Sequence, residues 1–255
     1  MSAINRYFIE ISFVGTGYHG WQIQNNAISV QEVLNNKLSV IFRQPIETTG
    51  CGRTDAGVHA KSFFAHFDFQ SNNSDEFNSE PLLRSINAIL PKDIAAKRIL
   101  KVEDNAHARF DATLRTYEYH IHFNKEPFKD GFSWELRDKP DLDLMNEAAE
   151  LLMTYTDFSC FSKSNTQVKT NNCKIAAAYW TENADGIIFR ISADRFLRNM
   201  VRAIVGTLIM VGKKEITPEI VKDIIESKNR SNAGTSVPAC GLYLTEVKYP
   251  YIEKV

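Results

Sequence analysis

Apolar and polar residues alternate along this chain with the two periods that are typical of strands and helices. Residues 115–123 alternate with a period of two, which predicts a strand with one apolar and one polar face. The apolar face carries Tyr117, Tyr119, Ile121 and Phe123, and the opposite face carries Thr116, Glu118, His120 and His122. Residues 30–41 have an apolar stripe with helical spacing instead. Ser29 precedes this stripe and Glu32 follows three residues later, a capping box that predicts where the helix begins.

The same patterns predict the rest of the elements. Strands are expected at residues 6–14, 46–50, 63–69, 94–102, 115–123, 174–181, 186–193 and 242–248. Helices are expected at residues 29–41, 79–90, 141–153, 196–211 and 217–227. Each half then has the order β-α-β-β-α-β of a ferredoxin-like unit, with one extra helix late in the second half. We therefore expect an α+β fold of two halves, residues 1–105 and 106–255, whose sheets join edge to edge and leave a cleft where they meet.

Composition narrows the classes of protein that need to be considered. The chain has 255 residues, of which 44% are hydrophobic and 24% are charged, as in an ordinary globular protein. The formal net charge of −1 argues against general nucleic-acid coating, so that any contact with nucleic acid must come from a local basic patch. The longest uncharged apolar stretch of a predicted helix, residues 203–212, is half the length of a membrane span. Residues 1–6 do not resemble a signal peptide, and we expect a cytoplasmic protein with no membrane segment.

Two patterns that suggest metal binding are weak. The four cysteines form no CxxC pair, which disfavours a zinc knuckle and favours free thiols. His120 and His122 share a strand face, but no third ligand lies near them in the sequence. We therefore predict no metal.

Two glycine-rich segments look like nucleotide-binding motifs. Residues 15–20 match GxGxxG after a predicted strand, but the next helix begins at Ser29 rather than inside the motif. Gly52 and Gly57 have Walker A spacing, but Val58 and His59 stand where Lys and Ser or Thr are required. Both segments are predicted to be loops, and a dinucleotide-dependent enzyme remains an alternative that NAD titration would test.

The stretch 50–60 contains the strongest candidate for chemistry. Three glycines bracket Arg53 and Asp55, and glycine allows tight turns and close approach of a ligand. An arginine two residues from an aspartate can hold the carboxylate ionised and orient it. The alternative is a β-turn with an ordinary surface ion pair, which composition alone favours.

Basic residues are segregated from acidic ones, which predicts a surface that can follow a phosphate backbone. Arg195, Arg198 and Arg202 have the spacing of one stripe on the predicted helix 196–211 and its start. Segments 158–174 and 228–245 contain basic residues and no acidic ones; these basic residues are Lys163, Lys169, Lys174, Lys228 and Arg230. Phe158 and Phe161 are candidates for stacking on bases. A solvated basic helix face and core aromatics are the alternatives.

The sequence resembles the TruA family of tRNA pseudouridine synthases. Residues 52–60, Gly-Arg-Thr-Asp-Ala-Gly-Val-His-Ala, are similar to the family's catalytic signature. Other blocks agree in order and spacing, at residues 20–22, 30–31, 90–94, 107–112, 115–119, 196–197, 200–202, 233–234 and 238–244. The matching blocks together span nearly the whole chain.

The resemblance implies an activity and a mode of action. Members of the family convert uridine to pseudouridine at positions 38, 39 and 40 of the tRNA anticodon stem-loop. They are built from two ferredoxin-like halves in an extended, mostly antiparallel sheet with helices on one side, around a central RNA-binding cleft. They act as homodimers without metal or cofactor. The same chemistry on another RNA site, or a non-catalytic RNA-binding module, are the alternatives.

The resemblance also assigns roles to individual residues. Asp55 is the catalytic carboxylate, which attacks C1′, attacks C6 or removes a sugar proton. Arg53 fills the space that the flipped base leaves, and Tyr117 stacks on uracil and can handle the C5 proton. Arg202 pairs with the catalytic carboxylate. Leu244 is a candidate for packing against the base. Separately from the resemblance, the clustering of Arg195 and Arg198 with Lys163 and Lys169 predicts that these residues bind the RNA.

Overall fold

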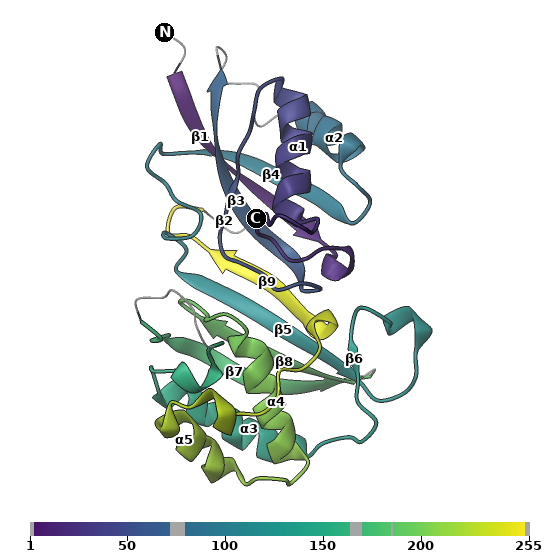
Figure 1. Cartoon of the computed structure of the whole chain (residues 1–255), viewed down its shortest axis with the longest axis vertical. Coiled ribbons are helices and arrows are strands. Elements are labelled where there is room, and N and C mark those ends of the chain that lie inside the picture. The colour runs from purple at the N-terminus through teal and green to yellow at the C-terminus, as the bar shows by residue number, and fades with distance from the viewer. Residues whose placement is uncertain (1–2, 72–79, 164–169, 185, 253–255) are drawn as a thin grey trace. The chain divides into compact units, whose positions relative to one another are not determined.

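The computed structural model of the chain describes residues 3–71, 80–163, 170–184 and 186–252. These residues divide into two compact units (Figure 1). Unit 1 consists of Met1–Thr113 and Leu244–Val255, and unit 2 consists of Leu114–Tyr243. The C-terminal segment therefore returns to the unit that contains the N-terminus.

Unit 1 is an antiparallel sheet with two helices. Its strands are β1 (Ala3–Phe13), β2 (Thr49–Gly50), β3 (His59–Ser71) and β4 (Ile94–Val102). The hydrogen-bonded order is β4-β1-β3, and β2 pairs with β3, which is the arrangement of a ferredoxin-like unit. The register places Ile9 of β1 opposite Ala65 of β3 and Ile99 of β4.

The two helices of unit 1, α1 (Val30–Phe42) and α2 (Glu80–Ile89), contact each other, and Figure 1 shows them on the same side of the sheet. The helix α1 begins where the capping box predicted, since the Ser29 hydroxyl accepts a hydrogen bond from the Glu32 amide at 3.2 Å. The helix buries Val30, Leu34 and Leu38, the same stripe that the sequence indicated. Burial of this stripe against aromatic strand residues forms the core of the unit.

Unit 2 has a second antiparallel sheet. Its strands are β5 (Leu114–His122), β7 (Ile175–Asn183) and β8 (Gly186–Ala193), in the order β5-β8-β7, with the short β6 (Trp134–Glu135) parallel to β5. The last strand, β9 (Leu242–Lys248), begins in unit 2 and ends in unit 1. Its first residues lie beside β5, since the ring of Tyr243 on β9 is 4.8 Å from the ring of His120 on β5.

Three helices complete unit 2: α3 (Leu142–Leu151), α4 (Met200–Gly212) and α5 (Pro218–Ser227). Nearly every residue of α4 is buried, and α3 contacts α4, α5 and β7. The α+β class and the ferredoxin-like order of elements in each half are thus confirmed. None of the helices within the described residues is both long and apolar enough to cross a membrane.

Three details of the elements differ from expectation. The predicted strand 46–50 is a strand only at Thr49–Gly50, whereas the strand predicted at 63–69 runs from His59 to Ser71. The helix predicted at 196–211 begins only at Met200. Ser79, the predicted start of α2, lies outside the described residues.

Candidate active site

Asp55 lies in a tight turn that leads into β3. The Val58 amide donates a hydrogen bond to the Asp55 carbonyl at 3.2 Å, which closes a four-residue turn that begins at Asp55. Gly57, the third residue of this turn, has a φ of 80°, a conformation that favours glycine and that a type II turn requires at this position. The local sequence thus dictates the turn, and the Asp55 side chain is half-buried at its start.

Arg53, two residues earlier, is exposed. A long cationic side chain at the rim of a half-buried carboxylate can reach a ligand that approaches from solvent. Arg53 and Asp55 are therefore at least partly accessible to solvent and do not lie in the core. Both belong to unit 1.

The GxGxxG segment is a loop, as predicted. It forms a short 3-10 turn at Gly15–Gly17, and α1 does not begin until Val30. A dinucleotide site of this type needs the helix N-terminus at the motif, and here the helix begins ten residues after Gly20. The dinucleotide alternative is therefore set aside on structural grounds.

In unit 2, Tyr117 lies on β5 next to a basic segment. Tyr117 is half-buried, and its ring meets the ring of Phe196 edge-on at 5.1 Å. Phe196 stands between Arg195 and Arg198, so this aromatic contact brings the predicted tyrosine and the predicted basic segment together. The neighbouring Tyr119 is buried and donates its hydroxyl to the Pro238 carbonyl at 2.8 Å, and burial raises its pKa.

Arg195 and Arg198 are not on a helix, so the prediction that they share a helical stripe with Arg202 is wrong. The Asp194 carboxylate accepts hydrogen bonds from the amides of Lys174 and Arg195, at 2.8 and 2.7 Å, which hold the chain at the end of β8. Asn199 has a φ of 67°, which interrupts helical geometry directly before Met200. The two arginines lie in this connecting loop, Arg198 exposed and Arg195 half-buried.

Arg202 is on the first turn of α4 and is fixed to the segment before β9. Its Nε donates to the Val237 carbonyl at 2.7 Å, and the Val237 amide donates back to the Arg202 carbonyl at 3.3 Å. The Nε bond sets the direction of the guanidinium group, and the backbone bond holds the two segments together.

The segment that receives Arg202 is held by residues that the sequence analysis did not assign to the site. Arg230 donates to the carbonyls of Ala233 and Gly234 and to the Ser236 hydroxyl, at 3.3, 3.1 and 3.0 Å. Asn199 also donates to the Ser236 hydroxyl. Arg230 is among the basic residues that are predicted to follow a phosphate backbone, and no pattern in the sequence indicated that it also bonds this loop.

Several other residues that were predicted to contact RNA also have neighbours within the chain. Lys228 pairs with Asp157 at 2.9 Å. Phe158 and Phe161 are fully buried, which confirms the alternative that they are core aromatics and excludes them as stacking candidates. Leu244 is 2% exposed on β9. Lys163 is exposed, and its amide donates to the Arg198 carbonyl at 3.2 Å, while Lys169 lies outside the described residues.

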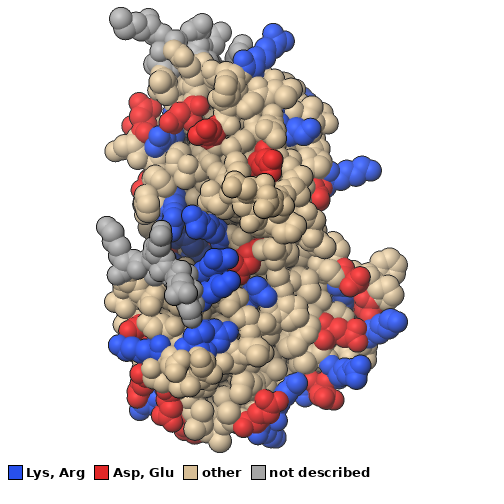
Figure 2. All heavy atoms as spheres, viewed as in Figure 1, with Lys and Arg blue, Asp and Glu red and all other residues tan. Residues whose placement is uncertain are grey.

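The surface of unit 2 carries basic side chains close to these residues. On the face that Figure 2 shows, Lys and Arg gather around the start of α4, whereas both signs of charge mix around α5. The exposed Arg198, Lys163 and Lys174 belong to this region of the chain. A local basic patch on a chain of near-neutral total charge is what contact with a phosphate backbone requires.

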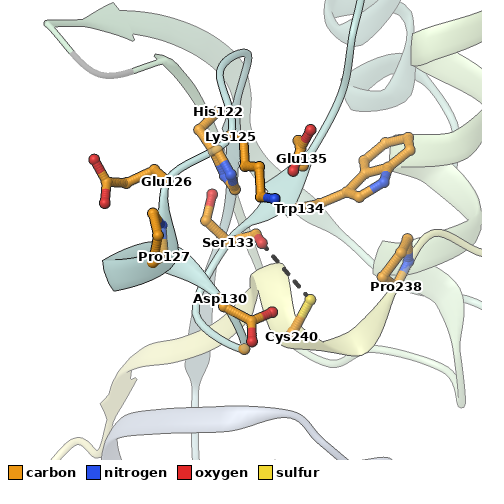
Figure 3. Close-up of a pocket in the computed structure, with 11 residues that line it drawn as sticks. His122, Lys125, Glu126, Pro127, Asp130, Ser133, Trp134, Glu135, Pro238 and Cys240 are labelled. Atoms are coloured by element: carbon orange, nitrogen blue, oxygen red, sulfur yellow. Dashed lines mark hydrogen bonds between the residues drawn. The ribbon is translucent and has the colours of Figure 1, made fainter.

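A cavity of about 430 Å³ opens elsewhere in unit 2, at the end of β5 (Figure 3). His122, Trp134, Pro238 and Cys240 line it, and the Cys240 thiol lies 3.8 Å from the Ser133 carbonyl. The charged residues of its lining are three acids and one base, namely Glu126, Asp130, Glu135 and Lys125. The excess of acidic residues disfavours binding of a phosphate group in the cavity. None of the predicted site residues lines the cavity.

Among the residues that the structure describes, no group of three His, Cys, Asp or Glu side chains is placed to bind a metal ion. His120 instead lies 3.3 Å from the Glu118 carboxylate, which also receives Arg190 at 2.9 Å. Burial raises the pKa of the Cys160 and Cys173 thiols to about 12, so both remain protonated at neutral pH.

Comparison with known proteins gives one consistent result. A family model described as tRNA pseudouridine synthase matches residues 148–250. The tRNA pseudouridine synthase A of Parabacteroides distasonis is 47% identical over 247 residues, covering 97% of each chain. The proteins of the same name from Porphyromonas gingivalis and Bacteroides thetaiotaomicron are 49% and 48% identical, over 96% and 97% of this chain and 97% and 91% of their own.

Proposed function

The chain belongs to the TruA family of tRNA pseudouridine synthases, and from this premise we propose that it isomerises uridine at positions 38, 39 and 40 of the tRNA anticodon stem-loop, with Asp55 as the catalytic carboxylate. The chain is an isomerase that makes pseudouridine in tRNA, which follows from its sequence identity to tRNA pseudouridine synthase A over nearly the whole chain. The positions in the RNA and the roles of individual residues are the proposal. A non-catalytic RNA-binding module is excluded by the family.

The reaction needs an ionised group next to the sugar. The N1–C1′ bond breaks, the uracil turns, and C5 bonds to C1′; C5 then loses its proton and N1 gains one. Positive charge develops at C1′ as the bond breaks, as in glycoside hydrolysis. A carboxylate held at C1′ stabilises this charge or bonds to it.

The observation that carries the proposal is the position of Asp55. It is a half-buried carboxylate at the first position of a glycine-shaped turn, with the exposed Arg53 beside it. A target base must leave the helical stack before it can react, and Arg53 is proposed to occupy the space that it leaves.

Unit 2 is proposed to supply the remaining groups. Tyr117, held edge-on by Phe196, is proposed to stack on the uracil and to handle the C5 proton. Arg202, directed by Val237, is proposed to hold the carboxylate ionised, and Arg195 and Arg198 to contact phosphates. Leu244 is 2% exposed, so its packing against the base rests on the family resemblance alone and stays a prediction. The RNA-binding cleft between the halves remains a prediction.

The chain is also proposed to act in the cytoplasm as a homodimer without metal or cofactor, as the family resemblance implies. The isomerisation is redox-neutral, so this chemistry needs no redox cofactor. Analytical ultracentrifugation of the full chain tests the dimer, which is expected at twice the monomer mass; a single monomeric species at micromolar concentration would contradict it.

The sites of modification can be tested in cells. In a strain that lacks this gene, pseudouridine mapping of total tRNA is expected to show loss at positions 38, 39 and 40. The wild-type gene is expected to restore these sites, and the Asp55→Asn gene is not. Unchanged modification at these positions with loss at another RNA site would favour the alternative substrate.

A further inference from the structure

The glycine-rich loop of residues 15–21 packs directly against the turn that carries Asp55. The Gly15 amide donates a hydrogen bond to Nδ1 of His59 at 3.0 Å, and His59 is 1% exposed. An imidazole nitrogen that accepts a hydrogen bond carries no proton, so Nδ1 of His59 acts as an acceptor in this contact. His59 follows the turn directly and begins β3.

The loop touches the turn on both sides of Asp55. A Cβ atom on Gly15 would lie 2.0 Å from the Val58 carbonyl oxygen, and one on Gly20 would lie 2.2 Å from the Thr54 carbonyl oxygen. Gly20 also has a φ of 83°. These two positions require glycine because the backbones approach too closely for any side chain.

Backbone hydrogen bonds reinforce the same contact. The Trp21 amide donates to the Thr54 carbonyl at 3.4 Å, and the Gly57 amide donates to the Tyr18 carbonyl at 3.3 Å. The residues before and after Asp55 are therefore each bonded to the loop.

The loop itself is anchored away from the turn. The Tyr18 hydroxyl donates to the Asp93 carboxylate at 2.7 Å, and the Asp93 carbonyl accepts from the Val14 amide at 2.9 Å. The Trp21 ring is 1% exposed and lies 4.2 Å from the Phe63 ring of β3. The loop is thus held at Tyr18 and Trp21, and Val14 directly before it is held as well.

We propose that His59 and the loop 15–21 position the Asp55 carboxylate, with His59 as the residue that locks the loop to the turn through its Nδ1 acceptor. This inference rests on the proposed role of Asp55. A displacement of a reacting group by about 1 Å can cost on the order of a hundredfold in rate, so a support of this kind controls turnover more than affinity. His59 is a positioning residue, because it acts through the backbone next to Asp55.

The test compares two substitutions of His59 by steady-state tritium release from tRNA. His59→Leu keeps an apolar side chain and removes the acceptor, and kcat is expected to fall by about a hundredfold while KM changes by less than about twofold. His59→Asn places an amide oxygen close to the position of Nδ1, and kcat is expected to stay within about threefold of wild type.

A matched control exists on the same strand. His66 is also buried, and its Nδ1 accepts a hydrogen bond from the Ala108 amide at 3.1 Å. His66→Leu removes an equivalent bond, and its kcat is expected to stay near wild type. Equal losses in His59→Leu and His66→Leu, or equal losses in His59→Leu and His59→Asn, would overturn the proposal.

Tyr18→Phe tests the same support without removing a buried ring. It deletes the hydroxyl that bonds Asp93, and kcat is expected to fall about fivefold with KM unchanged, the effect of one lost hydrogen bond. Tyr251→Phe, which deletes a hydroxyl bonded to Asp111 at 2.7 Å, serves as its control and is expected to have no effect. The same kcat in both variants would refute the positioning role even where His59→Leu fails to fold.

The two proposals fail in different ways. If Asp55→Asn turns over at the wild-type rate, the proposed function of Asp55 is wrong. If Asp55→Asn is inactive while His59→Leu and Tyr18→Phe keep their kcat, the catalytic assignment stands and the support is wrong.

Discussion

His66 is a buried histidine that couples the stability of unit 1 to pH. It is 7% exposed, and burial, followed by the nearby Arg6 guanidinium, lowers its pKa from 6.5 to about 4. Its ring also faces His107 at 4.6 Å, with Asp68 and Asp111 close enough to act on it in the opposite direction. Folding therefore keeps this ring neutral at a pH where it is protonated in the unfolded chain.

The first prediction concerns stability between pH 6.5 and pH 4. In this window the unfolded chain binds a proton that the folded chain does not, so the free energy of unfolding is expected to fall as pH falls, by up to about 3 kcal/mol. Urea titrations at several pH values measure it. His66→Asn keeps an acceptor and removes the titration, and its stability is expected to decline less over this window. An equally steep decline in this variant would contradict the assignment to His66.

The second prediction concerns the Tyr117 hydroxyl. Tyr117→Phe keeps the ring, with its edge-on contact to Phe196, and removes only the hydroxyl. If the hydroxyl handles the C5 proton, kcat is expected to fall by about a hundredfold while tRNA affinity is retained, since general acid–base groups contribute on that order. Filter binding run beside tritium release separates the two. Equal loss of binding and turnover would remove the chemical role of this tyrosine.

At the scale of elements, the close contact between α4 and the segment before β9 holds the groups around Arg202. A Cβ on Gly206 would lie 1.9 Å from the Thr235 carbonyl oxygen, and the Gly234 amide donates to the Thr207 hydroxyl at 2.9 Å. Gly206 of α4 thus packs directly against the backbone at Thr235. The segment whose carbonyl accepts the hydrogen bond from Arg202 depends on this close contact.

The third prediction is that Gly206→Ala destabilises unit 2. The added methyl group has no room, so the segment must move, and a loss of about 1–3 kcal/mol is expected from overpacking. Thermal unfolding measures it. Gly17→Ala is the control, because the nearest atom to its Cβ would be 4.0 Å away, and it is expected to leave the melting temperature nearly unchanged. A Gly206→Ala protein as stable as this control would contradict the packing argument.

Most elements could be predicted from the sequence because their signals are local. The stripe of α1 and its Ser29 cap, and strand β8, are as expected from hydrophobic period and capping chemistry. The start of α4 was misplaced because Asp194 and Asn199 impose their own backbone geometry, and their bonding partners lie elsewhere in the chain. The role of the GxGxxG segment was also hidden, since it depends on carbonyls some 40 residues later.

The candidate site was predicted only in part for a similar reason. Asp55 and Arg53 could be found because glycines shape their turn locally. His59 stood inside the recognised signature, but its role needs Gly15 as its donor, which no local pattern reveals. The partners of Arg230 and Lys228, two backbone carbonyls and the Asp157 carboxylate, could not be predicted because charge segregation does not reveal which groups a basic side chain contacts.

At the scale of the whole molecule, the fold depends on the return of the C-terminal strand. Leu244–Val255 belongs to the same unit as Met1–Thr113. Removal of the last strand would therefore disrupt the unit that contains the N-terminal strands. Contacts of such long sequence separation leave no periodic signal in the chain.

The fourth prediction concerns the binding of tRNA as a function of salt. Basic side chains around the start of α4 are expected to displace counterions, so affinity should fall steeply as salt rises. Neutralising Arg195, Arg198, Lys163 or Lys169 should each reduce the slope of log K against log salt by about one unit. Lys228→Gln is the control, since this lysine pairs with Asp157. A binding constant that does not respond to salt would contradict the electrostatic interface.

The proposed isomerisation of uridine in tRNA depends on the Asp55 carboxylate. Asp55→Asn preserves the shape of the side chain but removes its charge, and Asp55→Glu keeps the charge and moves it by about 1 Å. Tritium release from C5-labelled uridine in tRNA measures the reaction directly, and filter binding shows that substrate is still bound. Both variants are expected to bind tRNA, Asp55→Asn is expected to release no tritium above background, and Asp55→Glu is expected to release almost none. Release by Asp55→Asn at a rate near that of the wild type would contradict this dependence on Asp55.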